Sequence, residues 1–195
     1  DFFILATGVK SHTETGSTGD GFTWLAQIGH KVSEPRVSLV PIMVADEWVK
    51  KLSGFSLPNA KITLFQNGIK QTDSHERPAV KKGKVLFTHF GLSGPAVLNM
   101  SSEVGELLKY GEVVMSLDLL PQHDYATLNE ALQKLFKKES NKMFKNAIGI
   151  SGTGRSASGL IPTPLVSVII EKSGINPDTF CHSVTREERL NLVKV

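Results

Sequence analysis

Residues 86–98 read Leu-Phe-Thr-His-Phe-Gly-Leu-Ser-Gly-Pro-Ala-Val-Leu, and this stretch says more about the fold than any other. An apolar run ends at His89, a glycine follows, and Ser93 stands just before Gly94 and Pro95. This pattern is typical of a strand that turns at glycine and leads into a helix with proline in its first turn. The Ser93 hydroxyl, the His89 imidazole and the free backbone N–H groups of the helix start would then lie close together, an arrangement that suits a substrate pocket. The simpler interpretation is that Ser93 caps the helix and His89 is a hydrogen-bonded surface group.

Short strand candidates lie on both sides of this segment. Their apolar residues run together or alternate, the period-2 signal of a strand, over 37–43, 62–66, 85–89 and 113–119. Asn67-Gly68 is a type I′ turn signal, and helices are expected over 46–52 and after Gly94-Pro95. Short strands spaced in this way predict a small β-barrel or sandwich.

The C-terminal part of the chain is typical of helices. Three N-terminal capping signals each precede apolar residues at helical spacing. They are Thr127-Leu128-Asn129-Glu130 before apolar residues at 128, 132, 135 and 136, Thr163-Pro164 before a helix that stops at Gly174, and Thr185-Arg186-Glu187-Glu188 before a helix with Leu190 and Val193 on one face.

The first residues resemble the opening of an α/β unit. The apolar run Phe2–Ala6 predicts a strand buried on both faces, and a helix is expected over Asp20–Ile28 with Gly29 after it. Between them, Thr15–Gly21 is rich in glycine, which permits close backbone approach, and the helix that follows presents free N–H groups. Such a loop suits a phosphate, a flavin edge or a substrate anion, and on composition alone a plain tight turn explains it as well.

The composition excludes several classes of protein. The chain has 195 residues, 40% of them hydrophobic and 21% charged, which is typical of a globular protein. Its one cysteine, Cys181, excludes a disulfide framework and, with no signal peptide, predicts a cytoplasmic protein. No apolar run approaches the roughly 20 residues of a membrane-spanning helix, so no membrane partner is expected.

Two lysine clusters carry the positive charge. Residues 129–146 hold five lysines (134, 137, 138, 142 and 145) against two glutamates, and this local excess of three equals the formal net charge of +3. The other cluster is Lys81, Lys82 and Lys84. A solvated helix face and a basic loop explain them simply, and contact with phosphates of a nucleic acid or a cofactor is the alternative.

Other motifs argue against three kinds of chemistry. Residues 149–156 approach a P-loop, but Arg155 replaces the lysine and prolines follow, so a flexible connector is the better interpretation. The six histidines show no HxxxH or HExxH pairing, so no metal site is expected. A Ser93–His89 hydrolase pair lacks the GxSxG elbow and an acidic partner.

Several of these segments together resemble one known family. Residues 4–8, 15–22, 29–30, 38–41 and 86–98 are similar, in this order, to HI0933-like FAD-dependent oxidoreductases, also described as NAD(FAD)-utilizing dehydrogenases or aminoacetone-oxidase-like flavoproteins. In that family a β-barrel and a small helical subdomain interrupt an FAD-binding domain. The resemblance implies an α+β fold with three parts: a partial FAD-binding segment over 1–31, a β-barrel-like insert over 32–120 and a helical subdomain over 121–195. The chain begins at Asp1 with no methionine, so we expect an excised piece.

The resemblance also implies a division of roles among the site residues. Cofactor contacts would fall on Ala6, Thr7, Gly8, Gly16, Ser17, Thr18 and Gly19, and the substrate pocket would include Asp20, Thr88, His89, Gly91, Ser93 and Gly94. His89 is the one candidate for a catalytic role. Val9 stands where the family has a second glycine, and a β-branched residue resists a positive φ there. Residues 11–14 read Ser-His-Thr-Glu where the family has Ser-Tyr-Pro-Lys.

Two functions of different class follow. The first is the substrate-facing insert of a flavin-dependent oxidoreductase, inactive alone, whose partner is the rest of the FAD-binding domain. Because the family's GxGxxG motif has no counterpart here, we expect this chain not to hold FAD by itself. The resemblance leaves the substrate class open, because members of the family act on small molecules or on a uridine of ribosomal RNA, and the lysine clusters favour RNA. The alternative is a non-catalytic binding module, with RNA as a candidate partner.

Overall fold

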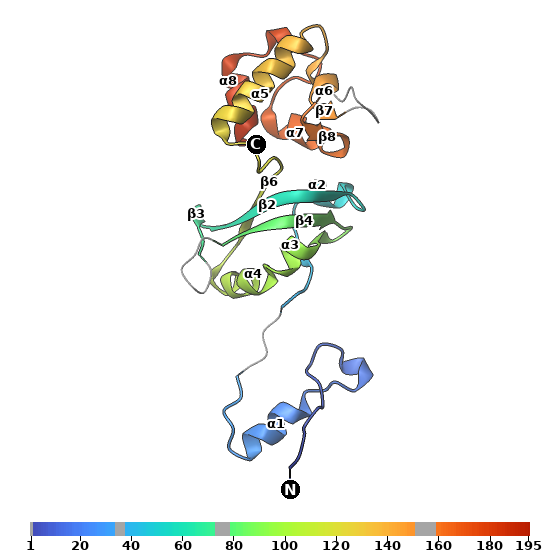
Figure 1. The fold of residues 1–195 in the computed structure, drawn as a ribbon, viewed down its shortest axis with the longest axis vertical. Helices are drawn as coiled ribbons and strands as arrows, with labels where there is room; N and C mark the ends of the chain where they lie inside the picture. Colours follow the sequence, from blue (N-terminus) through green and yellow to red (C-terminus); the bar gives the residue numbers. More distant parts are fainter. Residues whose placement is uncertain (1, 34–37, 73–78, 151–158) are drawn as a thin grey trace. The chain divides into compact units, whose positions relative to one another are not determined.

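The computed structural model describes residues 2–33, 38–72, 79–150 and 159–195. The chain divides into two compact units, Asp1–Ser38 and Leu39–Val195. Helices and antiparallel strands both contribute, which confirms the predicted α+β class (Figure 1). None of the helices in the described ranges is long and apolar enough to cross a membrane.

The first unit contains two short helices, η1 (Thr13–Thr15) and α1 (Asp20–Gln27). The helix predicted over 20–28 is confirmed, and Gly29 follows it with a φ of 94°. The strand predicted over Phe2–Ala6 is wrong: these residues form no strand, and Phe2, Phe3 and Ile4 are almost fully exposed. A strand buried on both faces takes its hydrogen bonds from neighbouring strands, and residues 2–33 supply none.

The second unit begins with a curled, half-barrel antiparallel sheet (Figure 1). Its order is β1-β5-β4-β2-β3, and β6 pairs with β2. The strands are β1 (Ile42–Met43), β2 (Ser56–Gln66), β3 (Ile69–Lys70), β4 (Val80–Phe87), β5 (Gly91–Ser93) and β6 (Val114–Asp118). The predicted barrel-like character is therefore confirmed.

The core of the sheet lies under two helices. α3 (Pro95–Leu98) and α4 (Ser101–Leu107) lie between β5 and β6 in the sequence, and a Cβ placed on Gly83 of β4 would contact Ala96 of α3. Ile62, Leu64 and Phe87 have no exposed surface. Each such side chain contributes about 1.5–3 kcal/mol on burial, so these positions hold the sheet and its helices together.

Some boundaries differ from the predictions. The strand expected over 37–43 is reduced to Ile42–Met43, because β1 has only the three-residue β5 to pair with and Leu39 has a positive φ of 56°. The strand expected over 85–89 begins at Val80 and ends at Phe87. The Asn67-Gly68 turn is confirmed, with φ values of 53° and 75° at the two positions. The predicted helix over 46–52 is α2 (Glu47–Lys51).

The helical part of the second unit comprises α5 to α8 and their connections. After η2 (Leu108–Tyr110) and β6, its elements are α5 (Tyr125–Lys138), α6 (Phe144–Ala147), β7 (Gly149–Ile150), β8 (Ile161–Pro162), η3 (Thr163–Leu165), α7 (Val166–Ser173), η4 (Cys181–Ser183) and α8 (Arg186–Lys194). The predicted connector over 149–156 begins as β7, which pairs in parallel with β8, and residues 151–158 lie outside the described ranges.

Of the three predicted caps, one is confirmed, one is shifted and one is wrong. The predicted cap at Thr163 is wrong: the N-caps of η3 and α7 are Pro162 and Leu165, neither with a side-chain cap, and the Thr163 hydroxyl donates to the Ile150 carbonyl instead. The Thr185–Glu188 capping box of α8 is confirmed. At α5, however, the N-cap is Asp124, and Thr127 is the N3 partner of the box. A carboxylate three residues before a threonine satisfies the same orphan N–H groups, so the helix begins three residues earlier than predicted.

Candidate functional site

The glycine loop of the first unit packs against the segment that precedes it. A Cβ on Gly8 would come within 2.9 Å of the Ser17 Oγ, and a Cβ on Gly21 would overlap the Thr7 hydroxyl. Both glycines are therefore needed for two segments about ten residues apart to lie in contact. The structure thus brings together Thr7, Gly8 and Ser17, which the resemblance assigned to the cofactor.

The loop also presents backbone donors. Gly16 and Gly19 have positive φ values of 93° and 81°, and Gly19 is the N-cap of α1. Within residues 2–33 the N–H groups of Ser17 and Gly19 have no acceptor. The Thr18 hydroxyl donates to the Asp20 carboxylate at 2.7 Å, so a negative charge already occupies the helix N-terminus. The loop accordingly fits neutral oxygen atoms, such as flavin carbonyls or ribityl hydroxyls, better than a pyrophosphate.

Two neighbouring residues complete this description. Val9 has no positive φ, because among the described non-glycine residues only Leu39 and Asn67 do. Of the pair Gly8-Val9, the glycine alone has a positive φ, of 74°. Valine is therefore accommodated without backbone strain where the family has a second glycine. Lys10 was not singled out from the sequence, yet its methylene chain lies against Gly19. Ala6 is exposed.

The segment around His89 forms a closed hairpin turn between β4 and β5. The Thr88 hydroxyl donates to the Gly91 carbonyl at 2.9 Å and accepts from the Gly91 N–H at 3.1 Å. Gly91 faces β1 so closely that a Cβ there would overlap the Ile42 carbonyl oxygen. The Thr88 hydroxyl therefore closes the turn, and the Gly91 position is set by packing of the sheet.

His89 and Ser93 are not brought together as a catalytic pair. His89 is exposed and lies edge-on to the Phe90 ring at 5.0 Å, with no hydrogen bond to any described residue. Ser93 pairs with Leu86 in the sheet. The N-cap of α3 is Gly94, with φ 93°, so the prediction that Ser93 caps this helix is wrong. A Cβ at Gly94 would lie 2.8 Å from the Lys84 carbonyl oxygen, and only glycine fits that place.

The lysine clusters are partly neutralised. Lys142 pairs with Glu139 at 2.7 Å, and Lys145 with Asp178 at 2.6 Å. Lys134, Lys137 and Lys138 of α5 are exposed and form no ion pair with any described residue. In the other cluster Lys81 lies 3.7 Å from Glu103, whereas Lys82 and Lys84 are exposed. Free positive charge therefore gathers along α5 and on one face of β4.

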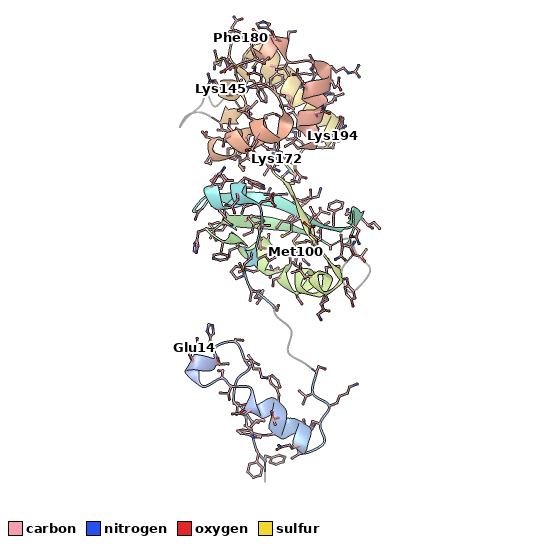
Figure 2. All side chains as sticks on the ribbon, turned by 180° about the vertical axis from the view of Figure 1, so that it is seen from behind. Glu14, Met100, Lys145, Lys172, Phe180 and Lys194 are labelled. Carbon is pink, nitrogen blue, oxygen red and sulfur yellow. The ribbon has the colours of Figure 1, made fainter. Side chains whose placement is uncertain are left out.

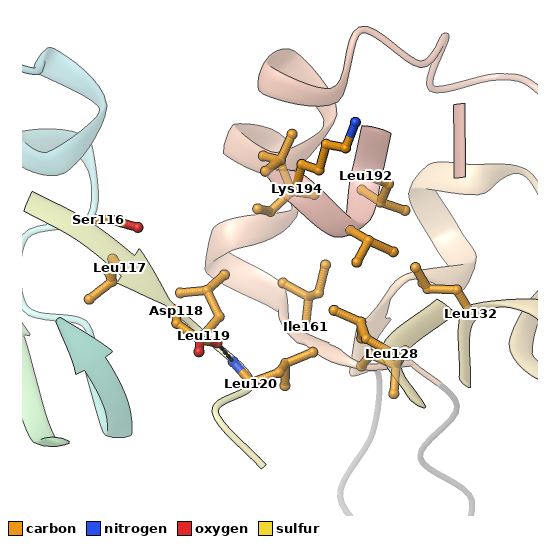
Figure 3. A pocket seen from close by; sticks show the side chains of 14 residues that line it. Ser116, Leu117, Asp118, Leu119, Leu120, Leu128, Leu132, Ile161, Leu192 and Lys194 are labelled. Carbon is orange, nitrogen blue, oxygen red and sulfur yellow. Dashed lines mark hydrogen bonds between the residues drawn. The ribbon is translucent and has the colours of Figure 1, made fainter. Parts of the chain in front are cut away.

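Three cavities formed by described residues of the second unit are large enough to consider as binding sites. One, of about 180 Å³, is apolar and lies where β6 approaches α5 and α8, with Leu117, Leu128 and Leu192 in its wall (Figure 3). Another, of about 270 Å³, lies between β1 and β6 and is also mostly apolar. The third, of about 520 Å³, is polar and belongs to the helical part; it is lined by Gln133, Phe136, Lys137, Ser140, Cys181, His182, Val184 and Arg189. None of the three includes Thr88, His89, Gly91, Ser93 or Gly94.

The polar pocket gathers residues that the sequence did not indicate as a group. Lys137 comes from α5, His182 from η4 and Arg189 from α8. η4 and α8 are close in the sequence, but α5 lies tens of residues before them, so only the folded chain brings all three together. Within the described ranges no three His, Cys, Asp or Glu side chains are arranged to hold a metal ion.

Cys181 lines this pocket but its side chain is buried. Burial, followed by the nearby Glu139 carboxylate, raises the pKa of the Cys181 thiol. A raised pKa leaves less thiolate at any given pH, and the thiolate is the nucleophile. We therefore expect iodoacetamide at mildly alkaline pH to modify Cys181 at least about tenfold more slowly in the folded chain than in urea. Equal rates, measured by mass spectrometry, would show an exposed thiol.

The comparisons with known proteins agree on one relationship. The family described as HI0933-like protein barrel and H2TH domain matches residues 36–195. A ribosomal RNA dihydrouridine synthase of Haemophilus influenzae is 30% identical over 194 residues, 97% of this chain. A ribosomal RNA dihydrouridine synthase of Escherichia coli is 31% identical over 150 residues, 75% of this chain. The chain spans 40% of the length of the first relative and 32% of the second.

Proposed function

This chain belongs to the HI0933-like family, and from this membership we propose that it forms the substrate-facing part of a flavin-dependent enzyme that reduces a uridine in ribosomal RNA. The observation that carries the proposal is the match to a ribosomal RNA dihydrouridine synthase along 97% of this chain. This match includes the glycine loop, the sheet and the helical part together. The proposal thus concerns the chain as one functional segment of a longer protein.

In this reaction the role of the chain would be to position the uridine and the flavin. Dihydrouridine forms when a hydride and a proton add across the C5=C6 double bond of uracil, and a bound reduced flavin would supply the hydride. On the chain's side, the contact of Thr7 and Gly8 with the glycine loop and the free N–H groups of Ser17 and Gly19 support a place beside the flavin. We assign no proton donor, because His89 is exposed and makes no hydrogen bond within the described residues.

An RNA substrate also agrees with the charge distribution. Lys134, Lys137 and Lys138 follow one another along the exposed side of α5 without ion pairs to described residues. Lysines of this kind neutralise phosphates and release counterions, so the affinity of the chain for RNA should fall steeply with salt concentration. A small uncharged substrate would give no such dependence.

A chimera tests the proposal. In the Haemophilus influenzae relative, the segment that matches this chain is replaced by residues 1–195, and the chimera is expressed in a strain that lacks its own rRNA dihydrouridine synthase. We expect dihydrouridine to return to the ribosomal RNA, measured by mass spectrometry of RNA digests. The matched control carries Gly8→Val, because valine at φ 74° strains the backbone and its Cβ would press on Ser17; it should lose most of the product.

Two outcomes would contradict the proposal. A folded, flavin-loaded chimera that leaves ribosomal RNA without dihydrouridine would exclude uridine as the substrate of this segment. A folded chimera that binds RNA but holds no flavin would support the non-catalytic binding module instead.

A further inference from the structure

The polar pocket of the helical part has positively charged groups in its wall, and an exposed aromatic ring stacks on one of its lining residues. Lys137 and Arg189 are the charged groups in its wall, and no carboxylate lines it. The acidic neighbours are already engaged: Glu139 pairs with Lys142, and Glu188 closes the capping box of α8. The pocket is therefore electrostatically suited to an anion.

Arg189 is held so that part of its guanidinium stays available. Its Nε donates to the Asn129 side-chain oxygen at 2.9 Å, which fixes the plane of the group. The two terminal nitrogens have no acceptor among the described residues. A guanidinium oriented by one partner presents its remaining N–H groups as a fork, the geometry that matches two phosphate oxygens.

His182 of the pocket wall and the neighbouring Phe180, which is not part of the wall, form a flat aromatic surface. The His182 Nδ1 lies 2.8 Å from the Ser140 carbonyl oxygen, which can only accept, so Nδ1 carries the proton and Nε2 remains for another partner. The His182 ring stacks on the Phe180 ring, with centroids 5.6 Å apart and planes 12° apart. Phe180 is 44% exposed although it is a large apolar side chain, and Figure 2 shows it at the surface of the helical part.

The backbone holds this aromatic pair rigidly in place. Phe180 forms an antiparallel bridge with Met143, and the Cys181 N–H donates to the Lys142 carbonyl at 3.0 Å. The chain thus holds an exposed phenyl ring against a residue of the pocket wall instead of burying it. Aromatic platforms beside positive charge are the usual way in which proteins bind unpaired nucleotides, because every base has a stacking face and every nucleotide a phosphate.

We propose that this pocket binds an unpaired nucleotide of RNA, with the base stacked on Phe180 and the phosphate between Lys137 and Arg189. The proposal rests on the proposed function in naming RNA as the polymer, and it deepens it by giving the helical part a binding site. An unpaired nucleotide is required because the bases of a duplex already stack on one another and cannot reach a protein ring.

Binding measurements on the whole 195-residue chain test this directly. The probes are a fluorescein-labelled 12-nucleotide single strand of RNA and a 12-base-pair RNA duplex, followed by fluorescence anisotropy over a series of salt concentrations. We expect Phe180→Ala to weaken binding of the single strand about tenfold while leaving the duplex unchanged. Lys137→Ala should weaken both and reduce the slope of log affinity against log salt by about one.

Matched controls separate the site from general surface effects. Tyr110→Ala removes another exposed aromatic ring, and Lys70→Ala removes an exposed lysine of β3; both should stay within about twofold of the unchanged chain. A second readout is a 2-aminopurine base in the single strand, whose fluorescence should be quenched on binding and not in Phe180→Ala. Circular dichroism checks that each variant is folded.

The results distinguish this proposal from the proposed function. Unchanged single-strand affinity and unchanged quenching in folded Phe180→Ala would overturn the binding site, even where the chimera makes dihydrouridine. Loss of single-strand binding in Phe180→Ala and Lys137→Ala would support the site, even where the chimera makes no dihydrouridine.

Discussion

We expect Phe87→Ala to lower the free energy of unfolding of the second unit by about 3–5 kcal/mol. The Phe87 ring has no exposed surface and lies between two other aromatic rings, Trp48 at 6.0 Å and Phe55 at 5.8 Å. Alanine would remove the apolar contacts of the ring and leave a cavity that the fixed β4 backbone cannot close. The loss should therefore reach the range measured for fully buried phenylalanines.

Urea denaturation followed by circular dichroism measures this change. Phe180→Ala is the matched control, because Phe180 is 44% exposed and its loss should cost at most about 1 kcal/mol. A loss below about 1 kcal/mol in Phe87→Ala would contradict the position of this ring in the core.

The second large effect is expected for Gly91→Ala, at about 3 kcal/mol of lost stability. A Cβ at this position would overlap the Ile42 carbonyl oxygen and lie 2.9 Å from the Val44 N–H nitrogen. Both atoms belong to the backbone, so no side-chain rotation can relieve the contact. The β1–β5 pairing would have to separate, which would expose the edge of the sheet.

Two glycines of this chain serve as controls for the Gly91 substitution. Gly54 has a positive φ of 88° but open space around it, so Gly54→Ala should cost only about 1–2 kcal/mol from the backbone conformation. Gly105 lies in α4 with open space and an ordinary φ, and alanine there should stabilise the chain by about 0.5–1 kcal/mol. If all three variants changed stability equally, the steric explanation for Gly91 would be wrong.

The structure agrees best with the sequence where signals are local. The α8 capping box, the α1 helix and the Asn67-Gly68 turn depend on residues within about four positions of each other. Predictions failed where distant partners decide the outcome. The run Phe2–Ala6 has no strand to pair with in residues 2–33, and β5 forms at Gly91–Ser93 because β1 and β4 lie on either side of it.

The candidate sites show the same limit. The contact of Thr7 and Gly8 with the glycine loop lies within one short unit and was indicated by glycine spacing and by resemblance. The polar pocket was not, because Lys137 lies tens of residues before His182 and Arg189 and meets them only when α5 packs against η4 and α8. A basic residue on a helix gives no sign of which distant residues will share a pocket with it.

The long strand β2 also has a kinetic consequence. β2 pairs with β3 across the two-residue turn Asn67-Gly68, and β4 pairs with β5 across a similarly short turn. The pairing of β6 with β2 is far less local, because Asp118 of β6 lies opposite Lys61 of β2, 57 positions away in the sequence. Closing a longer loop costs more entropy, so the two hairpins should form early and β6 late. In native-state hydrogen exchange, the amides of β6 should accordingly open more readily than those in the middle of β2, which is flanked on both sides. Since β6 leads into α5, the strand that connects sheet and helices would be the last to join the sheet and the first to leave it.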